Sequence, residues 1–238
     1  MRNAQIHPIT NVDYLIVTSD NSGAIGEKLE DTIRVDYETL AYYSFRVAVM
    51  ECIAAGGTPI SITIQNFCGD DKWDQLENGV TNGLQELHIS DVPITGSTES
   101  NFGMSQSALG IVIIGRCSKP KTPMPPAIEG KWAVIGKPLI GQEVLDQSDE
   151  LAPLDLYKRL SEIEGVSLWP VGSKGILHEW NQFTSDEGYK DTIKCELDIH
   201  KSGGPSTCFI LSYPDQIEKR IKVLADRLFF PILLSFKG

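Results

Sequence analysis

The sequence contains no apolar run long enough to cross a bilayer. Its first residues, MRNAQIHPITNVDY, hold no apolar signal core, so we predict a cytoplasmic protein without a membrane contact. Basic residues are also few: the net charge is −11 over 238 residues, and no cluster of Lys and Arg is present. Since a polynucleotide partner requires a basic face that displaces counterions, we expect no nucleic-acid partner.

Motifs for zinc, redox centres and P-loop nucleotide binding are missing as well. The five cysteines are widely spaced and form no CxxC pair, which predicts reduced thiols. Neither HExxH nor GxxxxGK[ST] occurs, so a zinc hydrolase and a P-loop enzyme receive no support. A nucleotide partner is still allowed, because acidic side chains can reach phosphate through a divalent metal ion.

The patterns that are present predict an α+β protein. Apolar residues recur at helical spacing over Tyr37–Ala55, and Ile60–Asn66 alternates like a half-buried strand. Strands and helices mix without a regular βαβ repeat. Further strands are expected at Asp13–Ser19, Val92–Thr95, Ala108–Gly115, Trp132–Gly136, Thr192–His200, Thr207–Tyr213 and Phe229–Phe236, and further helices at Trp73–His88, Leu151–Glu164, Gly175–Phe183 and Pro214–Leu228.

A proline-rich segment divides the sequence. Lys119–Gly130, KPKTPMPPAIEG, has four prolines, which resist both helix and sheet continuation. We therefore predict an N-terminal domain over residues 1–118, a joint over 119–130 and a smaller C-terminal α+β domain over 131–238.

The first candidate functional segment is DNSGAIGEK, Asp20–Lys28, expected as a loop after a strand. Its glycines let backbone amides approach an anion, a carboxylate can hold Mg²⁺, and Lys28 can neutralise phosphate as a point charge. Asp31 follows closely. The alternative is a tight surface turn, for which Asp, Asn and Gly are the usual residues.

Three further segments carry polar groups that need an explanation. Glu51 lies in an apolar helical stretch, where it needs a partner or a metal, unless it faces solvent or pairs with Arg46. The loop expected at Gly96–Phe102 contains Glu99 and several hydroxyls, and a polar hairpin loop is the alternative. A hairpin turn explains Lys201–Pro205, and a ligand-contacting loop is the weaker interpretation.

Taken in order, the first three segments resemble the superfamily of aminoimidazole ribonucleotide synthetase, here called PurM-like. Thiamine-monophosphate kinase, selenophosphate synthetase and the hydrogenase-maturation dehydratase are other members. The resemblance covers roughly residues 13–116, with a strand, the Asp/Gly/Lys loop, an acidic helix before the turn GGTP, and the loop GSTE before an apolar strand. It implies Mg²⁺ and ATP as ligands, an ATP-binding first domain, a second domain for the substrate, and a homodimer whose N-terminal sheets pair into a barrel.

The resemblance also implies roles for individual residues. Catalytic roles fall on Asp20, Lys28 and Glu51. Metal binding falls on Asp20, Asp31, Glu51 and Glu99, with Thr98 as the alternative to Glu99 because the register of that loop is open by one residue. ATP binding falls on Asn21, Ser22, Gly23, Gly26, Lys28, Gly96, Ser97 and Thr98.

Within the superfamily, the segments DNSGAIGEK, ITGSTESNF and SALGIVIIG look most like the small α-ribazole kinases of cobamide salvage. This likeness implies an Mg·ATP-dependent kinase that converts α-ribazole to its 5′-phosphate. A thiamine-monophosphate-kinase-like or synthetase-like enzyme acting on another small substrate is an alternative. A non-catalytic ATP-binding or sensing module is another.

Overall fold

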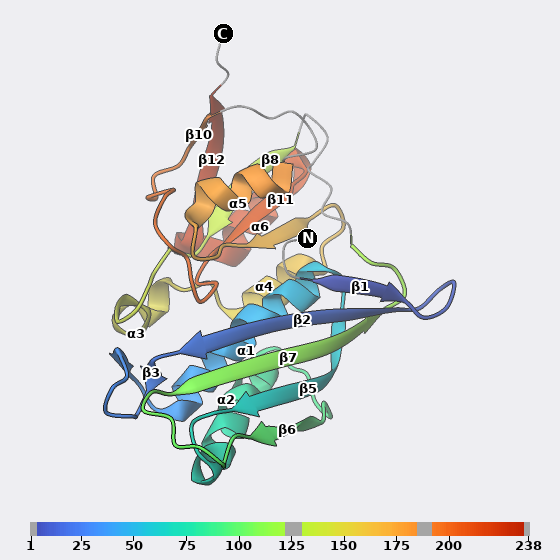
Figure 1. Ribbon diagram of the computed structural model, residues 1–238. Coiled ribbons are helices and arrows are strands. Elements are labelled where there is room, and N and C mark those ends of the chain that lie inside the picture. Colours follow the sequence, from blue (N-terminus) through green and yellow to red (C-terminus); the bar gives the residue numbers. More distant parts are fainter. Residues whose placement is uncertain (1–3, 122–129, 185–191, 236–238) are drawn as a thin grey trace. The chain divides into compact units, whose positions relative to one another are not determined.

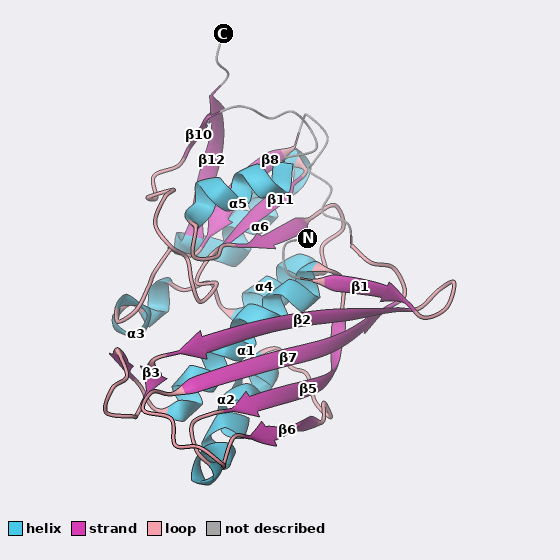
Figure 2. Cartoon of the chain, viewed as in Figure 1, coloured by secondary structure: helices cyan, strands magenta, loops and turns pink. Residues whose placement is uncertain are grey.

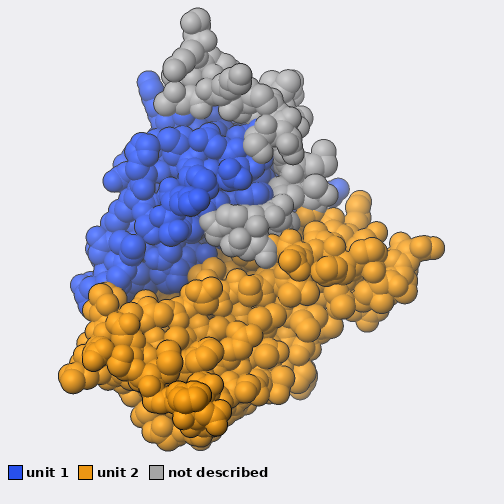
Figure 3. Space-filling view, viewed as in Figure 1, with its two compact units in different colours: residues 1–2, 122–238 blue, residues 3–121 orange. Residues whose placement is uncertain are grey.

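The computed structural model describes residues 4–121, 130–184 and 192–235. The chain divides into two compact units, residues 3–121 and residues 122–238 with 1–2 (Figure 3). Most of the expected joint, residues 122–129, lies outside the described residues. In the described residues no helix combines the length and the apolar character needed to cross a membrane.

The first unit is built on a mixed five-stranded sheet (Figures 1 and 2). All neighbouring strands are antiparallel except β5 and β6, which are parallel. The strand order is β1 (Gln5–Pro8), β2 (Tyr14–Gly23), β7 (Ala108–Cys117), β5 (Thr58–Asn66) and β6 (Ile94–Thr98), and a separate parallel pair consists of β3 (Ile25–Gly26) and β4 (Ile33–Arg34).

Two helices, α1 (Tyr37–Ala54) and α2 (Trp73–Glu86), cover one face of this sheet (Figure 1). A Cβ at Gly79 of α2 would collide with the Glu38 carbonyl oxygen, and one at Gly83 would collide with the ring of Phe45. These glycines weaken α2 as an isolated helix. They are explained by the close approach of its backbone to α1.

The other face of the sheet carries a stripe of partly exposed apolar residues. Ile16, Ile111 and Ile113 face the helices and are fully buried. Because side chains alternate along a strand, Leu15, Val17, Val112 and Ile114 project to the opposite side, where each is only half-buried. No helix of the first unit covers this stripe in the described residues.

The second unit has a five-stranded antiparallel sheet with helices on both faces. Helix α5 covers one face through a core rich in tryptophan, whereas Tyr157 of α4 packs edge-on against Phe209 on the other. The strand order is β10 (Thr192–Lys194), β12 (Phe229–Ser235), β8 (Lys131–Ile135), β11 (Phe209–Tyr213) and β9 (Ser167–Pro170), and the helices are α3 (Glu143–Asp146), α4 (Leu154–Ser161), α5 (Gly175–Thr184) and α6 (Glu218–Ala225).

The α+β prediction is confirmed, but several element predictions are wrong in detail. The strand expected over Thr192–His200 ends at Lys194, and the helix expected over Pro214–Leu228 is α6 flanked by 3-10 turns. Strands β1 and β9 were not predicted. Since β10 and β11 are not neighbours in the sheet, Lys201–Pro205 is not a hairpin turn.

Candidate functional site

The segment expected as a phosphate-binding loop begins as a strand. β2 continues to Gly23 and pairs Asp20 with Ile111 and Asn21 with Gly110 of β7. The loop prediction is therefore wrong for residues 20–23. Asp, Asn, Ser and Gly disfavour strands on their own, but pairing with a long buried strand overrides that preference. Beyond Gly23 the chain passes through Ala24, at φ 59°, and the short strand β3 before the loop that leads to β4.

The loop expected at Gly96–Glu99 is also mostly strand, because β6 extends through Thr98. Asn66 donates to the Thr98 hydroxyl at 3.1 Å, and the Glu99 amide donates to the Asn66 carbonyl at 2.8 Å. A Cβ at Gly96 would collide with the Ile64 carbonyl oxygen, so packing explains this glycine.

Most of the residues expected to contact ATP lie on two strands, β2 and β6, that are separated by β7 and β5. Paired residues of the four strands form rows across the sheet. One row across β2, β7, β5 and β6 contains Asn21, Gly110, Gln65 and Ser97. Three strand spacings separate its first and last members, which is about 14 Å. The structure therefore does not bring Asn21 and Ser97 into contact, and only an extended ligand could touch both.

The loop between β2 and β4 is held by a buried polar cluster. Asp31 Oδ1 accepts a hydrogen bond from the Ser107 amide at 2.7 Å, and its Oδ2 accepts from the Lys28 amide at 2.9 Å and the Ser107 hydroxyl at 2.7 Å. The Tyr37 hydroxyl lies 2.9 Å from Ser107 Oγ. Burial opposes ionisation of Asp31, but the hydrogen bonds from Ser107 and Lys28 outweigh it and lower its pKa.

Gly26 is required by this cluster. Its φ is 149°, a region that other residues rarely adopt, and a Cβ there would lie 2.6 Å from Ser107 Oγ and 2.8 Å from Tyr37 Cε1. The close approach of the loop to Tyr37 of α1 and to Ser107, just before β7, therefore explains why residue 26 is a glycine.

The Lys28 side chain is positioned by backbone carbonyls. Its ammonium donates to the Phe67 carbonyl at 2.8 Å and to the Gln106 carbonyl at 3.4 Å. An ammonium group has three donors, so one remains for a ligand on this exposed end of the sheet. The carbonyl groups of Phe67 and Gln106 carry no side-chain signature, and nothing in the sequence indicated them.

Two contacts between β2 and α1 show how far along the helix Asp20 lies. The Thr18 hydroxyl donates to the Ala48 carbonyl at 2.8 Å. Two residues earlier in β2, the side chain of Ile16 and the sulfur of Cys52 both lie beside Gly57. Strand β2 and helix α1 therefore run past each other in opposite directions.

Asp20 and Glu51 consequently lie on opposite sides of the Thr18 contact. Two residues of strand and three of helix separate them, about 11 Å along the sheet. Glu51 is 2% exposed, so the alternative in which it faces solvent is wrong. Asp20 is half-buried, and Glu51 lies in the core beneath the sheet.

A magnesium ion held by several protein carboxylates does not fit this arrangement. No group of three His, Cys, Asp or Glu side chains is placed to hold a metal ion in the described residues. Asp31 is occupied by its hydrogen bonds, and Glu99 Oε1 accepts from the Asn101 and Phe102 amides at 2.7 and 3.2 Å. In proteins Mg²⁺ is often held by one or two carboxylates together with substrate phosphates, so we treat Mg²⁺ as part of an incoming nucleotide complex.

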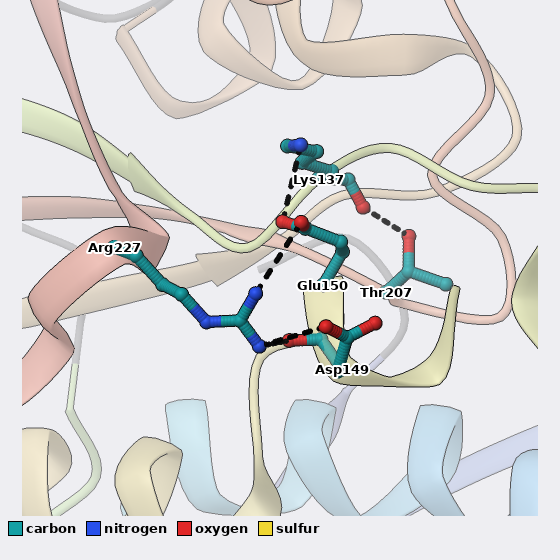
Figure 4. A network of polar contacts seen from close by, with 5 residues as sticks. All are labelled: Lys137, Asp149, Glu150, Thr207 and Arg227. Carbon is teal, nitrogen blue, oxygen red and sulfur yellow. Dashed lines mark hydrogen bonds and ion pairs between the residues drawn. The ribbon is translucent and has the colours of Figure 1, made fainter.

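The second unit contains a polar network that stabilises its own loops (Figure 4). Glu150 accepts from Lys137 at 3.1 Å and from Arg227 at 3.4 Å, and Arg227 also contacts the carbonyl and carboxylate of Asp149. The Thr207 hydroxyl donates to the Lys137 carbonyl at 2.8 Å. Exposed ion pairs of this kind contribute little individually, and this network joins loops rather than presenting a free charge.

Comparison with known proteins identifies the fold. No protein-family model and no curated protein match the sequence. The structure is similar to thiamine-monophosphate kinase from Stenotrophomonas maltophilia K279a, with 13% sequence identity, a TM-score of 0.65, and 97% of this chain and 85% of that chain covered. It is also similar to a structure of the HypE–HypF complex, with 11% identity, a TM-score of 0.62, and coverage of 93% and 85%. The chain has the PurM-like fold.

A third PurM-like structure is Thermotoga maritima PurL in complex with ATP. It shares 13% identity with this chain at a TM-score of 0.53, and the match covers 99% of this chain and 37% of that one. The chain therefore spans about a third of the length of the PurL chains that it matches. At these identities the similarity establishes the PurM-like fold alone.

Proposed function

We propose that this protein binds ATP as its magnesium complex and transfers the terminal phosphoryl group to a hydroxyl of a small molecule. The observation that carries the proposal is the preset ammonium of Lys28, which has a free donor at the end of the sheet. Two PurM-like neighbours are a thiamine-monophosphate kinase and a PurL bound to ATP, which supports a nucleotide as the ligand.

Lys28 would offset charge on the transferring phosphoryl group. Phosphoryl transfer requires mainly positioning and electrostatic stabilisation, so a fixed cation contributes directly, and we assign no general base. Asn21, Ser22, Gly23 and Gly26 would line the phosphate end. Gly96, Ser97 and Thr98 would contact the distant part of the nucleotide, since the sheet separates the two sets by about 14 Å.

Exposed apolar side chains on the segments that meet at Lys28 support a substrate with an apolar ring. The three segments that meet at Lys28 carry Leu29, Phe67, Phe102 and Met104, and the exposed fraction of Leu29 is 87% and that of Phe102 is 78%. α-Ribazole carries a methylated benzimidazole, which such side chains suit, so we propose it as the first acceptor.

We further propose that the protein is a homodimer through the face of the first sheet opposite α1 and α2. The half-buried stripe of Leu15, Val17, Val112 and Ile114 supports this, because an apolar sheet face is stabilised by burial against another layer. Size-exclusion chromatography with light scattering would report the mass, and a monomer at micromolar concentration would contradict it.

The test of function is ADP release from Mg·ATP with and without α-ribazole, with thiamine monophosphate as a second acceptor. We expect release that depends on α-ribazole and falls about 10- to 100-fold in Lys28→Met, because a hydrogen bond to a charged group is lost. The matched control is Lys119→Met, an exposed lysine of the same unit. Turnover with thiamine monophosphate alone would reassign the acceptor.

A second candidate is an ATP-binding module without turnover. The fixed Lys28 ammonium would serve nucleotide binding without transfer equally well. Calorimetric binding of ATP, combined with no ADP release for any acceptor, would establish this module and contradict the kinase.

A further inference from the structure

We propose that Asp31 is a positioning residue for Lys28 rather than a metal ligand, and that it acts through Ser107 and Tyr37. We call these four residues the Asp31 clamp. The proposal rests on the proposed function, in which Lys28 contacts phosphate. It replaces the metal-binding role that the sequence resemblance implied for Asp31.

The first argument is the peptide group between Gln106 and Ser107. Its N–H donates to Asp31 Oδ1 at 2.7 Å, and its carbonyl oxygen accepts from the Lys28 ammonium at 3.4 Å. These two atoms point in opposite directions from one rigid plane. Asp31 therefore orients one of the two carbonyls that hold the tip of the Lys28 side chain.

The second argument is that Asp31 also holds the base of the same side chain. Its Oδ2 accepts from the Lys28 amide at 2.9 Å. One carboxylate thus acts on both ends of the lysine, on the backbone directly and on the ammonium through the Gln106–Ser107 peptide group, while the Phe67 carbonyl also holds the ammonium. Long side chains lose considerable rotamer freedom when they are ordered, so a preset lysine binds an anion with less entropic cost.

The direction of the hydroxyl chain follows from the donor count. Ser107 has one hydroxyl hydrogen, and it goes to Asp31 Oδ2 at 2.7 Å. The Tyr37 hydroxyl must therefore donate to Ser107 Oγ at 2.9 Å. Tyr37 is the first residue of α1, so the chain of hydrogen bonds anchors the Lys28 loop to the start of that helix.

Three of the roughly four acceptor sites of the Asp31 carboxylate are used by these donors. A metal ion would have to displace them, and with them the anchor of Lys28. This separates the two roles experimentally. A metal ligand sets the concentration of Mg²⁺ that is needed, whereas the clamp sets the affinity for the phosphate end of the nucleotide.

The test uses the full chain and the variants Asp31→Asn, Ser107→Ala, Ser107→Thr, Tyr37→Phe and Lys28→Met, with the exposed Ser105→Ala as control. In nucleotide-free protein, Asp31→Asn should accelerate hydrogen exchange at the Lys28 and Ser107 amides. Unchanged exchange at both amides overturns the clamp, whether or not the protein turns over ATP.

The functional readout is KM for Mg·ATP against kcat, measured with α-ribazole. We expect Asp31→Asn to raise KM about tenfold, since hydrogen bonds to a charged carboxylate are lost. Ser107→Ala should share the defect, and Ser107→Thr should restore the wild-type value. Combining Asp31→Asn with Lys28→Met should give no defect beyond that of Lys28→Met.

The Mg²⁺ titration decides between the two roles. Half-saturating free Mg²⁺ at saturating ATP should be the same in Asp31→Asn and wild type. A rise of tenfold or more in Asp31→Asn but not in Lys28→Met overturns the proposal and makes Asp31 a metal ligand. Wild-type protein that neither binds nor hydrolyses Mg·ATP contradicts the proposed function instead. The hydrogen-exchange rates of the Lys28 and Ser107 amides then still test the hydrogen bonds of the Asp31 clamp.

Discussion

Asp31 and Lys28 bond opposite ends of the same peptide group, that between Gln106 and Ser107. The two residues are three apart in the sequence, whereas the peptide group that joins them is more than seventy residues away. Local loop geometry and the start of β7 are therefore a single structural unit, and their stability should respond to the same substitutions.

The ionisation of Asp31 predicts a pH dependence of stability. Its pKa is lowered in the folded state, so its contribution is present above the unfolded pKa and is lost as pH falls through the folded pKa. Asp31→Asn should lower the free energy of unfolding by about 1–3 kcal/mol at pH 7. This difference should persist to pH 5 and shrink below about pH 4. Urea unfolding at each pH measures it, and a difference that grows toward low pH would contradict the assignment.

Gly26 offers a sharper test of the loop geometry. Gly26→Ala introduces a Cβ that lies 2.6 Å from Ser107 Oγ at a φ of 149°, so we expect a loss of more than about 2 kcal/mol. Gly23→Ala is the control, because nothing lies within 4 Å of a Cβ there. Thermal unfolding of both variants would show the contrast, and equal melting temperatures would mean that the loop does not contact Ser107.

The packing of α2 against α1 predicts that a Gly→Ala substitution, which normally stabilises a helix, will destabilise this one. On an open helix surface Gly→Ala stabilises by about 1 kcal/mol. Gly79→Ala should instead destabilise, because its Cβ collides with the Glu38 carbonyl of α1. Asn78→Ala, at an exposed neighbouring position, should be neutral or stabilising. Chemical denaturation compares the three proteins, and a stabilised Gly79→Ala would show that α1 and α2 lie further apart.

The separation of Asp20 from Glu51 predicts additive effects. The effects of substitutions that lie more than about 7–10 Å apart usually add within a few tenths of a kcal/mol. The effects of Asp20→Asn and Glu51→Gln on the free energy of Mg·ATP binding should therefore add in the double variant, so that the fold-changes in the dissociation constant multiply. Isothermal titration of the four proteins completes the cycle. A double variant no weaker than the worse single one would mean that both carboxylates serve one ion.

Much of the fold follows from the sequence, because its long periodic segments are self-consistent. Helix α1 was expected at Tyr37–Ala55 and spans Tyr37–Ala54. The extension of β2 through Asp20–Gly23 could not be predicted, since those residues favour turns and only pairing with β7 makes them a strand. The strand β1 is fully exposed and has no hydrophobic alternation to announce it.

Residues of the site could be predicted only where the residue type itself indicates a chemical role. Lys28 stands out because a lysine beside glycines suits phosphate. Ser107 carries no such signal, since a lone serine before an apolar strand is ordinary, yet it donates two hydrogen bonds to Asp31. The carboxylates could not be assigned individually from the sequence. Each of them could be a metal ligand by residue type, and only burial and hydrogen bonds distinguish Asp20, Asp31, Glu51 and Glu99.

The row that joins Asn21 to Ser97 has a consequence for fragments of a ligand. Because β7 and β5 lie between these residues, a phosphate analogue and a free nucleoside would occupy opposite ends of the row without meeting. Each fragment alone should bind weakly, and neither should displace the other. Covalent linkage would then raise the affinity through effective concentration, so the sheet acts as a ruler that selects ligands by their length.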